Sequence, residues 1–123
     1  MAERIITGCL LVVAIIHLLP LSGVLGVGQL GPLYDVEISG SDLEILMRHR
    51  AVMFGLLGLF FAYSAFRPDI QPIAFGMALV SIISFILLAY SVGGFNAALR
   101  RVVIADVVAA VFLVIAVILY LQK

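Results

Sequence analysis

The sequence has few charged residues, no tryptophan and a single cysteine. Seven Lys/Arg and seven Asp/Glu make up 11% of its 123 residues, whereas a soluble globular domain has roughly 25%. The formal net charge is zero, and no run of basic residues is interleaved with aromatics. A nucleic-acid partner is therefore excluded. The lone Cys9 excludes a disulfide within the chain.

Apolar residues make up 65% of the chain, and its mean hydropathy is +1.31. These values are typical of an integral membrane protein in contact with lipid. Its length accommodates about four spans of about 20 residues each, with no separate soluble domain. We therefore predict an all-α fold, a single-domain membrane four-helix bundle.

Local signals predict where the helices begin and end. Pro20 closes the first helix. Ser41 and Glu44 form a capping box that opens the second helix after the longest connection, which includes an alternating apolar and polar segment at 34–38. Pro68 turns the chain into the third helix, and Asn96 caps the fourth. The predicted helices are about 5–21, 42–66, 70–92 and 97–121.

The ionisable residues inside these helices gather at one end of the bundle. Four spans put both termini on one side of the membrane, and the charges inside the helices lie toward the other side. Charge close to lipid is costly, so it has a structural partner or a functional task. If the internal arginines are paired, the positive-inside rule predicts cytoplasmic termini. The polar residues are His17, Glu44, Arg48, His49, Arg50, Asn96, Arg100, Arg101 and Asp106.

Helix geometry places several of these groups well inside the spans. Residues 48–50 lie roughly 9 to 12 Å along the second helix, and Asp106 lies roughly 15 Å along the fourth. The three consecutive residues spread over about 200°, so they cannot all face one partner, and at least one points inward. Asp106 must be either paired or protonated, and Arg48 or Arg101 is its predicted partner. Glu44 and Arg48 have the spacing of an ion pair.

Simpler roles are open for most of these residues. Glu44 and Asn96 serve equally well as helix caps. Arg50 and Arg100 have stems long enough to anchor at the lipid head groups. His17 has a backbone carbonyl within reach near the end of its helix. Small residues such as Gly55, Gly58 and Gly76 are typical of close helix packing.

Three stretches resemble a known family. Residues 48–58 (Arg-His-Arg-Ala-Val-Met-Phe-Gly-Leu-Leu-Gly), the Arg67-Pro68 turn and the Ala97-Ala98-Leu99-Arg100-Arg101 entry are similar to small bacterial four-helix membrane proteins of the DoxX-like type. The resemblance implies this topology and a bacterial inner membrane. Some members are associated with quinone-linked oxidoreductase complexes. The resemblance carries over no family active site.

Other chemistries find less support in the sequence. A small multidrug exporter is expected to carry a carboxylate in its first helix, where this chain has His17. A b-type haem between His17 and His49 is compatible with their depth, but otherwise no cofactor is expected. A metal site built from these histidines, Glu44 and Asp106 has no characteristic spacing, so no metal is predicted.

Two functions stay open. In the first, the polar end is a pocket for a lipophilic small molecule, with acid/base catalysis such as isomerisation, epoxide opening or cyclisation. Candidate catalytic residues are then Asp106 and His49, as the acid/base pair, together with Glu44 and His17, and candidate substrate-binding residues are Arg48, Arg101 and Asn96. In the second, the charges form a salt-bridge network in an accessory subunit of a larger membrane complex. A homo-oligomer is compatible with either.

Overall fold

The computed structural model describes residues 1–21 and 40–123, and the chain is helical through most of this part. Four long helices are each long and apolar enough to cross a membrane. They are α1 (Ala2–Leu18), α3 (Ser41–Ser64), α4 (Gln71–Val92) and α5 (Ala97–Gln122), and the short 3-10 helix η2 (Pro68–Ile70) leads into α4. The predicted all-α membrane four-helix bundle is confirmed.

The helix ends lie within three residues of the expected positions. The largest difference is in α1, which begins at Ala2 and continues past Leu18 as a 3-10 turn through Leu21. The stretch between α1 and α3 is the longest connection, as predicted. Its residues 22–39 lie outside the described part of the chain, and the predicted extended segment at 34–38 lies there too.

Two predicted helix caps have different outcomes. Asn96 caps α5, because its Oδ1 accepts a hydrogen bond from the Leu99 N–H at 2.8 Å. The predicted capping box of Ser41 and Glu44 is wrong. Gly40 is the N-cap instead, with a φ of +85° and no side-chain cap. Since glycine adopts this left-handed conformation without strain, the helix starts one residue earlier and Ser41 is already in its first turn.

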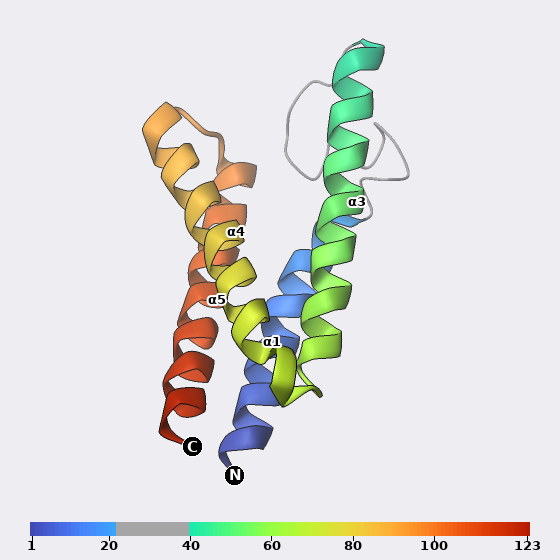
Figure 1. Ribbon diagram of the computed structural model, residues 1–123. Helices are drawn as coiled ribbons and strands as arrows, with labels where there is room; N and C mark the ends of the chain where they lie inside the picture. The colour runs from blue at the N-terminus through green and yellow to red at the C-terminus, as the bar shows by residue number, and fades with distance from the viewer. Residues whose placement is uncertain (22–39) are drawn as a thin grey trace.

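Helix α1 lies at the centre of the arrangement (Figure 1). It packs against both α3 and α5, while α4 packs mainly against α5 and only lightly against α3. The two chain termini lie together at one end of the molecule, and α3 diverges from α4 and α5 toward the other end. We call these the terminal end and the open end.

Small residues let the helices approach closely around α1. The core contains alanines from every long helix together with larger residues such as Leu10, Phe61 and Ile82. Gly55 and Gly58 of α3 are buried against the end of α1, as expected for a close helix contact. Gly76 is exposed, and an added Cβ there meets nothing within 4 Å. The prediction that Gly76 allows close packing is therefore wrong.

Hydrogen bonds between helices satisfy backbone groups at the terminal end. The Thr7 hydroxyl of α1 donates to the Ala65 carbonyl oxygen at 2.8 Å. The buried Gln71 amide nitrogen of α4 donates to the Ser64 carbonyl oxygen at 3.1 Å. Both bonds satisfy carbonyl groups at the end of α3, which have no partner inside the helix.

The turn between α3 and α4 carries exposed charge at this same end. Arg67 makes two hydrogen bonds to the Asp69 carboxylate, at 3.2 and 3.1 Å, and a third to the Tyr63 hydroxyl. The hydrogen bond to Asp69 raises the pKa of the Arg67 guanidinium. Pro68 starts η2, as expected from its fixed φ. The terminal end thus has charged groups outside and satisfied backbone groups inside.

Candidate functional site

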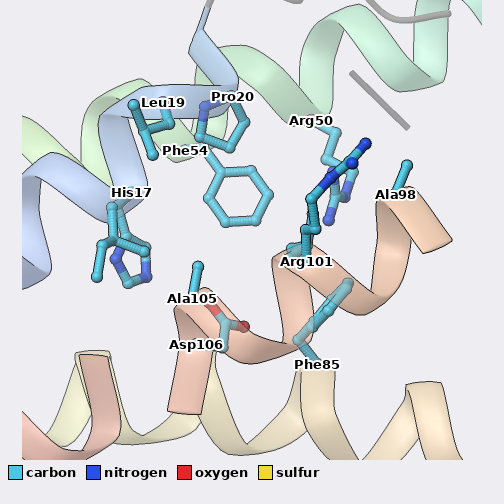
Figure 2. Close-up of a pocket in the computed structure, with 12 residues that line it drawn as sticks. His17, Leu19, Pro20, Arg50, Phe54, Phe85, Ala98, Arg101, Ala105 and Asp106 are labelled. Atoms are coloured by element: carbon cyan, nitrogen blue, oxygen red, sulfur yellow. The ribbon is translucent and has the colours of Figure 1, made fainter. Parts of the chain in front are cut away.

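A cavity of about 200 Å³ lies at the open end, over the end of α1 (Figure 2). We call it the chamber. Helices α1, α3 and α5 form most of its wall, and α4 contributes Phe85. The described residues that line it are Ile16, His17, Leu19, Pro20, Arg50, Phe54, Phe85, Ala98, Arg101, Val102, Ala105 and Asp106.

The chamber exists because α1 ends before its neighbours do. After Leu18 the chain makes a 3-10 turn that contains Pro20, and proline lacks the N–H group that a continuing helix needs. Helix α3 extends well beyond this point (Figure 1). The end of α1 therefore forms the floor of a space between longer helices.

His17 lines the chamber but uses both of its ring nitrogens inside the protein. Its Nδ1 lies 2.9 Å from the Val13 carbonyl oxygen, and its Nε2 lies 2.9 Å from the Ser81 hydroxyl of α4. A carbonyl oxygen only accepts, so Nδ1 carries a proton. The ring also packs edge-on against Phe61, with centroids 4.9 Å apart. The predicted bond to a backbone carbonyl is confirmed, and the second bond ties α1 to α4.

Asp106 of α5 is half-buried in the chamber wall. No hydrogen bond or ion pair reaches its carboxylate from residues 1–21 or 40–123. Arg50 of α3 lines the same cavity. Arg48, one of the two partners predicted for Asp106, pairs with Glu44 instead, at 3.2 Å.

Arg50 reaches the chamber from α3 through aromatic contacts. Its guanidinium carbon lies 4.6 Å from the centre of the Phe54 ring and 5.9 Å from that of Phe85. Such contacts stabilise an arginine that is partly removed from water. Arg50 is thus the inward member of the run 48–50, and it is more than an anchor at the lipid head groups.

Arg101 of α5 is the second arginine in the chamber wall. Its side chain extends along the chamber toward Arg50 (Figure 2). No described residue forms a hydrogen bond or an ion pair with Arg101. Both Arg101 and the neighbouring Arg100 are exposed, but Arg100 does not line the chamber. These two adjacent residues therefore differ in position but not in chemistry.

The predicted site residues divide into two groups. Three of them, His17, Arg101 and Asp106, line the chamber, and Glu44, Arg48, His49 and Asn96 do not. His49 is exposed on α3, so the structure does not bring the two histidines of the haem prediction to one cavity. In the described ranges, no three His, Cys, Asp or Glu side chains lie together as a metal site would require.

Sequence reasoning missed the aromatic and serine residues of this end. Arg50, Phe54, Leu57 and Phe61 have the i, i+4, i+7, i+11 spacing of one helix face. That pattern ends at a fully buried phenylalanine, and it was the available signal that Arg50 points inward. Ser81 had no comparable signal, because serine in an apolar helix equally well bonds its own backbone.

A second cavity of about 590 Å³ adjoins the chamber between α3 and α4. We call it the lateral groove. Arg50, Phe54 and Phe85 line both cavities, so these three side chains form the boundary between them. The rest of the groove wall is mainly apolar. Its other described lining residues are Leu57, Gly76, Met77, Val80, Ser81, Ser84 and Leu88.

The open end therefore combines an apolar enclosure with charged groups from two helices. Two guanidinium groups and one carboxylate line the chamber beside a fixed imidazole. Such a wall can hold the polar group of a small molecule against an apolar body. Comparisons with protein-family models, with curated proteins and with solved structures find no match for this chain.

Proposed function

We propose that the chamber binds a lipophilic small molecule within the membrane. The observation that carries this proposal is the cavity itself, in which Arg50, Arg101 and Asp106 converge beside the apolar end of α1. Binding pockets for small molecules typically combine an apolar wall with a few placed polar groups. In a membrane, ionisable residues at such a place point to a ligand or a substrate path.

Binding has more support than turnover. The predicted acid/base pair needs Asp106 and His49 at one substrate, and His49 lies on the exposed surface of α3. His17 is in the chamber wall, but both of its nitrogens are engaged. Asp106 is the remaining candidate for proton transfer, and a single carboxylate is enough to orient a ligand without any reaction.

The accessory-subunit hypothesis rests on the apolar outer faces of the helices. Lipid covers such faces as well as a partner protein does, so they do not favour a partner. The resemblance to DoxX-like proteins, the bacterial inner membrane and cytoplasmic termini remain predictions from the sequence.

Native mass spectrometry of the protein in mild detergent, followed by organic extraction, tests the proposal. We expect a discrete lipophilic mass to accompany the chain. Ala105→Leu places extra volume in the chamber wall and should abolish this mass. Ala97→Leu makes the same change at an exposed position of α5 outside the chamber, and the mass should persist. A bare chain, or one that purifies only with larger membrane proteins, would contradict the proposal.

A further inference from the structure

We infer that the ligand is a single-chain amphiphile with a carboxylate head group. In this arrangement, Arg101 binds the carboxylate in the chamber and the hydrocarbon chain lies in the lateral groove. The inference rests on the proposed function, because it requires that the chamber binds a ligand.

The charges of the chamber wall favour an anion. Two guanidinium groups and one carboxylate line it, and the fixed His17 ring has no nitrogen left to bind a ligand. The wall thus has one carboxylate, that of Asp106, against two guanidinium groups. Arg101 then remains as a cation with no ion pair to any described residue. Since a guanidinium matches a carboxylate with two parallel hydrogen bonds, an anionic head group complements this wall.

The lateral groove gives the hydrocarbon chain a place that is continuous with the chamber. Its wall consists mainly of apolar side chains of α3 and α4, and it meets the chamber at Arg50, Phe54 and Phe85. A chain in the groove would pack against the aromatic rings while its head group passes Arg50. The groove lies on the side where α3 and α4 pack only lightly, so an amphiphile enters it directly from the surrounding lipid.

The volumes favour one chain and a compact head group. The chamber holds about 200 Å³, less than the roughly 300 Å³ at which pockets for whole drug-sized ligands begin. A carboxylate and the first few carbons fit such a space, whereas the larger head group of a phospholipid, with its glycerol and phosphate, does not. The groove, at about 590 Å³, is within the range for the remaining chain.

Equilibrium binding of a fluorescent fatty acid tests this inference. cis-Parinaric acid is titrated against the protein, and its fluorescence in empty nanodiscs is subtracted because the probe also dissolves in lipid. The protein is held in zwitterionic phosphatidylcholine nanodiscs. Oleate and oleyl alcohol, which share one chain length and differ in head-group charge, then compete for the site. We expect saturable binding that oleate displaces and oleyl alcohol does not.

Two pairs of variants locate the head group and the chain. Arg101→Gln should weaken binding by about tenfold or more, because it removes a hydrogen bond to a charged group. Arg100→Gln should leave the dissociation constant unchanged. Gly76→Leu places a side chain in the groove at a position where an added Cβ meets no protein atom within 4 Å, and it should also weaken binding by about tenfold. Gly8→Leu has the same free space on α1, outside both cavities, and should have no effect.

The outcomes separate this inference from the proposed function. If oleyl alcohol competes as well as oleate, or if the two arginine variants behave alike, the carboxylate assignment is wrong. A neutral lipophile or a phospholipid as the extracted mass would also overturn the inference while leaving a binding function in place. If the wild-type chain binds neither probe and carries no extractable mass, the proposed function fails as well.

Discussion

The two ends of this molecule are built from the same helices but treat polar groups in opposite ways. At the terminal end, Thr7 and Gln71 satisfy carbonyl groups where α3 finishes, and the charges of Arg67 and Asp69 lie outside. At the open end, charged side chains line a cavity and Asp106 has no hydrogen bond from the described residues. The terminal end also has a cavity, of about 200 Å³, but Glu3 and Lys123 in its wall form an ion pair with each other, as stability alone requires. The open end departs from that pattern, which is why we assign it the function.

The largest contrast should come from two phenylalanines of α3 that lie two turns apart. Phe61 is fully buried, whereas Phe54 is half-buried at the chamber. Phe61→Ala should lower the free energy of unfolding by roughly 3 kcal/mol, since it leaves a void among packed helices. Phe54→Ala should cost about 1 kcal/mol, because its surroundings are already open. Unfolding in detergent followed by circular dichroism measures both, and equal losses would mean that the open end is packed as tightly as the core.

Two residues of the chamber wall, His17 and Asp106, should differ in how much they contribute to stability. His17→Ala removes one buried and one part-buried hydrogen bond and leaves a void beside Phe61, so it should cost roughly 2 to 3 kcal/mol. Asp106→Asn should change stability by less than about 0.5 kcal/mol, and it should not reduce the retained lipophilic mass, because it removes the one carboxylate of the chamber wall that would repel an anionic head group. The same unfolding assay and native mass spectrometry measure the two effects. Severe unfolding of Asp106→Asn would instead support a salt-bridge network.

Two glycines of α3 extend the comparison to the helix contact with α1. A Cβ on Gly58 would lie 2.6 Å from the Leu18 Cγ and 3.1 Å from the Ala14 carbonyl oxygen. Gly58→Ala should therefore cost roughly 1 kcal/mol despite its better helix propensity. At Gly55 the added atom meets only the side chain of Leu21, which can rotate away. Gly55→Ala should leave the free energy of unfolding unchanged in the same assay. A larger loss of stability for Gly55→Ala than for Gly58→Ala would mean that α1 and α3 are closer at Gly55.

The smallest effect should come from the ion pair of Glu44 and Arg48. Both side chains are substantially exposed, at 40% and 45%, and such pairs four residues apart contribute about 0.3 to 0.5 kcal/mol. Glu44→Gln should therefore leave unfolding within about 0.5 kcal/mol and ligand retention unchanged. A loss of ligand in this variant would extend the site along α3 beyond the chamber.

The fold was predictable because helix boundaries depend on a few strong local signals. Pro68 and Asn96 act within one turn of their own position, and the structure has a helix start at each. The capping box failed for an equally local reason, since Gly40 supplies the conformation that the serine was expected to provide. The prediction for Gly76 was wrong because close packing at this glycine depends on which helices are neighbours, and one sequence does not contain that information.

The sequence predicted how far along the helices the site residues lie, but not which way their side chains point. The sequence places ionisable residues at one end, and the structure agrees for His17, Arg101 and Asp106. Whether Arg48 or Arg50 points inward depends on a rotation of about 200° over three residues, and the apolar spacing toward Phe61 was the deciding signal. Ser81 comes from another helix, so its contact with His17 was beyond the reach of local patterns.

The early end of α1 also sets the depth of the chamber in a bilayer. Ala2–Leu21 is 20 residues, or about 30 Å of helix, which matches the thickness of the hydrocarbon layer. Helix α5 has 26 residues and, at about 39 Å, must tilt or project. The end of α1 therefore lies near the border with the head groups. A charged ligand bound above it would stay at the level of its own leaflet and would exchange with lipid without carrying its charge across the membrane interior.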